Sequence, residues 1–170
     1  MIRMKRLLSF WHDERGTAVV EGAIVIPVLM TLLFGVYEFS WYFYQQQLIT
    51  TGIHDGARYL ARTDDATNAT NQANAKSIAT TGAISGGTAR LNGWTSANVT
   101  ITIHSDTNTG SSTPCGSSAC YGNSSAIQVV VLSTSFTDPG LGFFGFLGLT
   151  APTIRVSHAE RVMNDSAPAL

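Results

Sequence analysis

Charged side chains are scarce in this sequence, and the shortage is uneven. Asp, Glu, Lys and Arg make up 12% of the 170 residues, which is about half of their share in an average soluble domain. Between Gly16 and His54 only Glu21 and Glu38 carry a charge. The rest of the shortage comes from a second half that is rich in Ser, Thr, Asn and Gly. The chain therefore divides into an apolar first part and a polar second part.

The sequence also lacks the patterns of several functional classes. A formal net charge of -1 offers no concentrated basic face for nucleic acid. The glycine-rich stretch 140–148 has no Lys-Ser/Thr pair that would bind a nucleotide phosphate. The four histidines are scattered: His12, His54, His104 and His158. We therefore expect no enzyme, no cofactor, no metal site, no nucleic acid and no small-molecule substrate.

An almost wholly apolar stretch runs from Thr17 to Tyr37. A bilayer core about 30 Å thick needs roughly 20 apolar residues in a helix, and this stretch is long enough. An aromatic cluster at residues 41–44 follows where an interfacial belt belongs. The pattern predicts a membrane-spanning helix. The alternative is the buried core helix of a soluble protein, although such helices seldom run this long without a polar face.

The charges that flank the apolar stretch predict its orientation. Positive residues gather before it, and the next basic residue after it is Arg58. The positive-inside bias therefore keeps the N-terminus in the cytoplasm and places the rest of the chain in the periplasm. A cleaved secretory signal is the alternative, but it would be shorter and would end at small residues. We expect a single-pass protein of the inner membrane.

The helical pattern continues beyond the apolar stretch, to Arg62. Apolar residues recur at helical spacing at positions 49, 53, 57 and 60, and polar residues occupy the other side. Gly52 and Gly56 thin one face of this helix, which allows another backbone to approach closely. The pattern predicts one long helix over 17–62, with an inner half in lipid and an amphipathic outer half.

The polar half, residues 63–170, predicts a small extracytoplasmic α+β domain. We expect a short helix around 69–80, a break at Gly86-Gly87, and strands near 99–104, 126–132 and 154–162 in a mostly antiparallel sheet. A Phe-rich segment, 141–149, follows the turn signal Asp138-Pro139-Gly140. Two interpretations stay open for this segment, a contact with a partner or the bilayer surface, and a cover over the sheet core.

The entry of the apolar helix carries the most specific local pattern, Arg15-Gly16-Thr17-Ala18-Val19-Val20-Glu21. An acidic side chain near lipid is unfavourable without a partner. If the chain were cut after Gly16, Thr17 would carry a new α-ammonium group. Residues i and i+4 share a helix face, so Glu21 would meet that amine or the amine of a neighbouring copy. The alternative is an interfacial glutamate with no specific role.

These features resemble a known family. A basic leader (1–16) that ends in glycine, a glutamate at the fifth position after it and a long apolar helix are typical of type IV prepilins and pseudopilins. The string RGTAVVEGAIVIPVLMTLLFGVYEF and the downstream HDGARYLAR are similar to the TadE/TadG-like proteins of the tight-adherence (Flp) pilus system. A fainter likeness lies in TAPTIRVSHAERV near the C-terminus.

The resemblance implies a minor pseudopilin or pilus assembly factor. Its implied partners are the membrane, a prepilin peptidase that cuts between Gly16 and Thr17, and other pilins, pseudopilins and pilus assembly proteins. Glu21 would be the conventional acidic position, and the protein would remain in the membrane or enter the pilus. The alternative is an uncleaved, membrane-anchored periplasmic binding or sensor module.

A proline in the apolar helix and a pair of cysteines in the polar half each predict a local structural feature. Pro27 lies within the apolar helix and removes a backbone hydrogen bond, which predicts a kink. The two cysteines, Cys115 and Cys120, are separated by a short flexible spacer. In an exported domain this arrangement favours a disulfide, since a zinc site would need four ligands.

Overall fold

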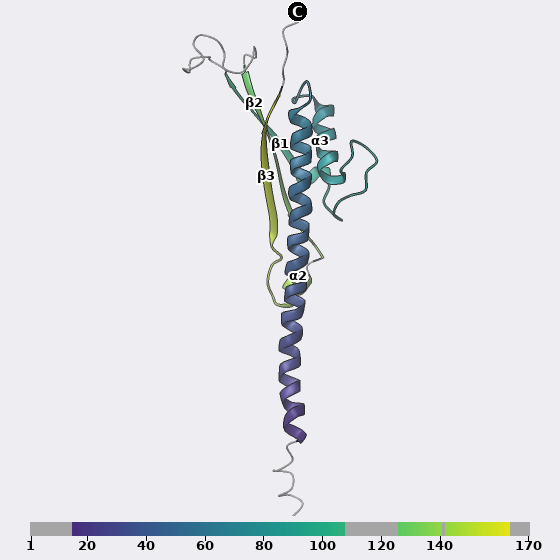
Figure 1. The fold of residues 1–170 in the computed structure, drawn as a ribbon, viewed down its shortest axis with the longest axis vertical. Helices are drawn as coiled ribbons and strands as arrows, with labels where there is room; N and C mark the ends of the chain where they lie inside the picture. Colours follow the sequence, from purple (N-terminus) through teal and green to yellow (C-terminus); the bar gives the residue numbers. More distant parts are fainter. Residues whose placement is uncertain (1–14, 108–125, 141, 164–170) are drawn as a thin grey trace, which may run out of the picture. The chain divides into compact units, whose positions relative to one another are not determined.

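The computed structural model describes residues 15–107, 126–140 and 142–163 of the chain. The chain divides into two compact units, Met1–Trp41 and Tyr42–Leu170. In order, the elements are α2 (Arg15–Ala61), α3 (Ala69–Thr81), the short 3₁₀ helix η1 (Ser96–Asn98), β1 (Val99–Thr107), β2 (Ala126–Thr137), α4 (Gly142–Phe146) and β3 (Thr153–Arg161) (Figure 1). This confirms the predicted α+β class, with a long apolar helix followed by a small domain.

Helix α2 is continuous over 47 residues, and Pro27 lies inside it. Proline lacks the N–H that would continue the hydrogen-bond ladder. Nearby, the Thr31 hydroxyl donates to the Pro27 carbonyl at 2.8 Å. The helix ends after Ala61, where Thr63 donates to the Leu60 carbonyl through both its backbone N–H and its hydroxyl. The predicted kink at Pro27 stays a prediction.

Helix α3 has clear signals at both ends. The Asn68 side chain accepts hydrogen bonds from the backbone N–H groups of Thr70 and Asn71, which satisfies donors that the first turn leaves unpaired. At the other end Gly82 has a φ of 79°, the left-handed conformation that glycine adopts without strain. The helix therefore matches the predicted range 69–80 within a residue.

The three strands form one antiparallel sheet in the order β1-β2-β3. Side chains alternate between the two faces of a strand, and the register sets Val99 opposite Thr134 and Leu132 opposite both Ile101 and His158. One face contacts the helices of the second unit. The other face carries mainly hydroxyl groups and arginines. Strand β2 extends beyond the predicted 126–132, to Thr137.

The outer half of α2 forms the centre of this second unit. Its residues Ile49, Ile53, Ala57 and Leu60 are completely buried, as the apolar spacing predicted. They pack with Val99, Val130, Leu132, Ile154 and the indole of Trp94 in a single core cluster. The helix and the sheet are therefore held together mainly by the burial of apolar surface.

Gly52 and Gly56 bring α3 close to α2. A Cβ atom on Gly52 would lie 2.2 Å from the Ala79 carbonyl oxygen, and one on Gly56 would lie 2.7 Å from the Ala75 carbonyl oxygen. Real side chains do not make such contacts, so only glycine permits this crossing. The predicted close approach of another backbone is confirmed, and that backbone belongs to the same chain.

Candidate functional site on the amino-terminal helix

The candidate cleavage site lies in the first turn of α2. Gly16, Thr17 and Glu21 are all exposed, and a Cβ atom on Gly16 would meet nothing within 4 Å. Thr17 and Glu21 are four residues apart in a continuous helix, so they lie on the same face, one turn apart. The Glu21 side chain therefore lies one helical turn from the backbone nitrogen of Thr17, which cleavage after Gly16 would convert into an amine.

The first part of α2, from Val19 to Tyr44, exposes an unusual amount of apolar surface. It is long and apolar enough to cross a membrane, and is the one such helix among the described residues. Its exposed large hydrophobic side chains run from Val19 to Tyr44: Val19, Val20, Ile24, Val25, Ile26, Val28, Leu29, Met30, Leu32, Leu33, Phe34, Val36, Tyr37, Phe39, Trp41, Phe43 and Tyr44. Soluble monomers rarely expose contiguous apolar patches of this kind. The segment is therefore a candidate membrane span, and it contrasts with the buried core helix that was the alternative.

Further along α2, a cluster of ring and charged side chains joins the helix to β3. The rings of His54 and His158 stack with their centroids 3.7 Å apart and their planes 17° apart. Nε2 of His158 lies 3.0 Å from Oε1 of Glu160, and the Arg58 guanidinium approaches the same oxygen at 4.0 Å. We call these four residues, His54, Arg58, His158 and Glu160, the helix–strand clamp.

The clamp lowers the pKa of the Glu160 carboxyl. The hydrogen bond with His158 is the largest cause, and the nearby charges of His158 and Arg58 act in the same direction, partly opposed by desolvation. The negative charge of Glu160 is therefore stabilised where α2 and β3 meet. The ion pairs of the clamp are partly exposed, so we expect them to add little to stability.

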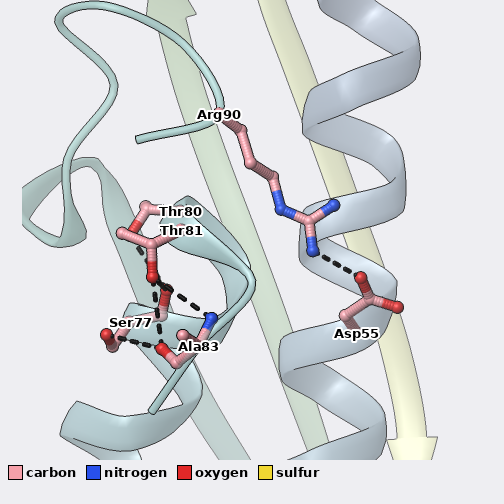
Figure 2. A network of polar contacts seen from close by, with 6 residues as sticks. All are labelled: Asp55, Ser77, Thr80, Thr81, Ala83 and Arg90. Carbon is pink, nitrogen blue, oxygen red and sulfur yellow. Dashed lines mark hydrogen bonds and ion pairs between the residues drawn. The ribbon is translucent and has the colours of Figure 1, made fainter. Parts of the chain in front are cut away.

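A second polar contact ties α2 to the loop that follows α3 (Figure 2). The Arg90 guanidinium lies 2.6 Å from the Asp55 carboxylate, and the Arg90 backbone N–H donates to the Thr80 carbonyl at 2.8 Å. At the end of α3, the hydroxyls of Ser77 and Thr81 both donate to the Ala83 carbonyl. This network closes the end of α3 and holds the following loop against α2.

The polar face of the sheet carries a shallow hollow of about 530 Å³. It is lined largely by small polar side chains and one arginine: Ala97, Asn98, Thr100, Ser133, Thr134, Ser135, Arg155, Val156 and Ser157. Hydroxyl groups and a guanidinium can bind polar or anionic groups. No three His, Cys, Asp or Glu side chains in the described ranges are placed to hold a metal ion.

The structure brings some of the predicted site residues together and leaves others apart. Thr17 and Glu21 share a face of α2, and Pro27 lies farther along the same helix. The predicted disulfide, Cys115–Cys120, lies outside the described residues. The helix–strand clamp was not predicted from the sequence. Two of its residues, His54 and Arg58, are the first and last residues of the string HDGAR, so this string was the available signal.

The described residues thus define an α+β protein whose first helix has an apolar exposed segment and a buried segment within a small sheet domain. Residues 16–58 match the family model described as TadE-like protein, which confirms the resemblance stated above for this part of the chain. The match contains the candidate span and the string HDGAR. No curated protein and no solved structure matches the chain.

Proposed function

We propose that the chain is a minor pseudopilin or assembly factor of a tight-adherence (Flp) type IV pilus. The observation that carries the proposal is the TadE-like segment, residues 16–58, since it coincides with the exposed apolar surface of α2. In this proposal α2 anchors the protein in the inner membrane, with the N-terminus in the cytoplasm and the second unit in the periplasm. The role is structural, and the partners are other pilins, pseudopilins and assembly proteins.

Processing by a prepilin peptidase would hydrolyse the peptide bond between Gly16 and Thr17. The first backbone N–H groups of a helix have no partner within the helix, so its first turn opens easily. Gly16 presents no side chain that would hinder a protease. After hydrolysis Thr17 carries an α-ammonium group, and the Glu21 carboxylate lies one turn away. Pairing with that amine, or with the amine of a neighbouring copy, reduces the unfavourable energy of a carboxylate at the edge of the bilayer.

The proposal is tested by the N-terminal residue of protein extracted from membranes after coexpression with the cognate peptidase. We expect a mature chain that begins at Thr17, and an unprocessed chain when Gly16→Leu places a bulky group at the cleaved bond. Gly22→Ala is the matched control in the same helix and should be processed normally, because its new methyl group would come no closer than 4.0 Å to another side chain. An intact Met1, with a peptidase active on another prepilin, would exclude processing.

The second candidate function is an uncleaved, membrane-anchored periplasmic binding or sensor module. The shallow hollow on the polar face of the sheet favours it, because hydroxyl groups and Arg155 line a volume in the range of small-molecule sites. The same measurement separates the two candidates. A membrane-bound protein that keeps its full leader supports the binding module.

A further inference from the structure

We infer that residues 142–149, which include α4, insert into the interface of the bilayer beside the point where α2 leaves it. We call these residues the α4 loop. The inference rests on the membrane anchor in the proposed function, and it adds a second membrane contact in the domain itself. Four observations carry it: exposure, the absence of charge, the position of the loop, and its internal hydrogen bonds.

The α4 loop displays apolar side chains to its surroundings. The exposed fractions are 82% for Phe146, 47% for Leu147 and 56% for Leu149. The rings of Phe143 and Phe146 are nearly parallel, with centroids 6.1 Å apart. The chain has no charged residue between Asp138 and Arg155. The interpretation of this segment as core therefore does not hold for Phe146, Leu147 and Leu149. An uncharged surface of Phe and Leu suits the boundary between headgroups and acyl chains.

The loop leaves the sheet at the end where α2 enters the second unit. Gln45 is buried in α2, and its side-chain amide donates a hydrogen bond to the carboxylate of Asp138, directly after β2. The other oxygen of Asp138 accepts from the Gly140 backbone N–H at 2.8 Å, which fixes the turn into the loop. The loop therefore starts beside residue 45, one position beyond an aromatic run that is typical of a membrane interface.

The opposite end of the same strand pair marks the side away from the bilayer. The Met163 backbone N–H, just after β3, donates to the carbonyl of Ala61, the last residue of α2, at 2.8 Å. Gln45 and Ala61 are 16 residues apart in one helix, a rise of roughly 24 Å at about 1.5 Å per residue. The α4 loop therefore lies at the end of the domain near the bilayer. Met163 lies at the other end, farther from the bilayer by up to roughly 24 Å.

The backbone of the α4 loop is already paired within the loop. The N–H groups of Leu147, Gly148 and Leu149 donate to the carbonyls of Phe143, Gly145 and Phe144, respectively, at 2.7–3.1 Å. Gly148 adopts a φ of 72°, which lets the chain turn back after the helix. Unpaired backbone groups are unfavourable in a poorly hydrated environment. The internal hydrogen bonds therefore lower the energetic cost of moving the loop into the bilayer interface.

The test uses the full chain, with Cys115→Ser and Cys120→Ser, in vesicles of phosphatidylethanolamine and phosphatidylglycerol. Leu149→Cys carries an environment-sensitive fluorophore, and spin-labelled lipids serve as quenchers. We expect blue-shifted emission that the lipid quenchers reduce, independently of the protein-to-lipid ratio. Adding Phe146→Ser should weaken both effects. The matched control, Met163→Cys, labels another exposed apolar residue (77% exposed) at the opposite end of the domain and should show neither effect.

Each other outcome overturns the inference in a different way. Emission at position 149 equal to that at 163 places the loop in water. A blue shift that appears only at high protein density, without lipid quenching, assigns the loop to a contact with a second copy. A label at Met30→Cys monitors the anchor independently. If lipid quenches position 30 but not 149, the loop inference fails and the anchor stands; if it quenches neither, both fail.

Discussion

Replacing Gly52 by alanine tests the central packing of the domain. The added methyl carbon would lie 2.2 Å from the backbone carbonyl oxygen of Ala79 and 2.8 Å from the Trp94 ring. Ordinary contacts at such a position begin near 3.4 Å, so α3 must move away from α2 by about 1 Å. The obstacle is backbone, and no rotation of a side chain can relieve it.

The expected magnitude follows from two opposing effects. Alanine is a better helix former than glycine by about 1 kcal/mol, whereas overpacking of a close interface costs about 1–3 kcal/mol and occasionally more. The clash is with backbone, so we expect the overpacking cost of Gly52→Ala to lie at the upper end of this range. After subtraction of the gain in helix propensity, the free energy of unfolding should fall by about 2 kcal/mol. For a chain of this size that corresponds to a decrease of roughly 4–8 °C in the unfolding temperature.

Gly56→Ala gives an internal comparison. Its methyl group would meet the Ala75 carbonyl oxygen at 2.7 Å and the movable Cδ2 atom of Leu132 at 2.9 Å. Part of this clash can relax, so we expect a smaller decrease than for Gly52→Ala. Gly22→Ala is the control without a clash, with its nearest neighbour at 4.0 Å, and should not decrease the unfolding temperature.

The assay is thermal unfolding of the full-length protein in detergent micelles, followed by near-ultraviolet circular dichroism. This signal reports the packing of aromatic residues such as Trp94, which is 1% exposed. We expect the lowest unfolding temperature for Gly52→Ala, a higher one for Gly56→Ala and the highest of the three for Gly22→Ala. If Gly52→Ala unfolds at or above the temperature of the unchanged protein, the close crossing of α2 and α3 is refuted.

Two more variants test polar contacts in the second unit. Thr134→Val removes the acceptor of the buried Trp94 indole N–H, at 3.0 Å, and should destabilise the fold by about 1–3 kcal/mol; Thr134→Ser keeps the hydroxyl, and equal losses in the two variants would contradict this role. The folded-state pKa of Glu160 is lowered, and the largest cause is its hydrogen bond with His158. The ionised carboxyl therefore stabilises the fold above the ordinary carboxyl pKa of about 4.3. This stabilisation is lost as the pH falls through the lowered pKa. Glu160→Gln should therefore flatten the loss of unfolding temperature in that acidic range, and parallel curves for the two proteins would argue against the contribution.

The elements of this fold were largely predictable because each has a local signal. Apolar spacing marked the outer half of α2, and alternation marked β1, where Val99 and Ile101 face the core. Asn68 and Gly82 are ordinary cap residues at the ends of α3. The extension of β2 to Thr137 was not predictable, because polar residues on the uncovered face of a sheet resemble a loop in sequence.

The contacts between distant residues could not be predicted from sequence in the same way. The stacking of His54 on His158 depends on the register between a helix and a strand that are far apart in the chain. The tie between Gln45 and Asp138 likewise depends on tertiary packing. By contrast, the expectation that Thr17 and Glu21 share a face of α2 needs only the helical repeat, and their pairing after cleavage stays a prediction.

Helix α2 has a practical consequence for work with fragments of this protein. Its residues Ile49 and Ile53 are fully buried, so a truncated version that starts after Ala61 would leave the sheet without its main apolar partner and should aggregate. A fragment intended for crystallisation or NMR spectroscopy has to begin at or before Tyr42. If α2 anchors the protein in the membrane as proposed, a protease that releases an intact domain has to cut before Tyr42. A cut farther along α2 would separate its buried residues, such as Ile49 and Ile53, from the sheet.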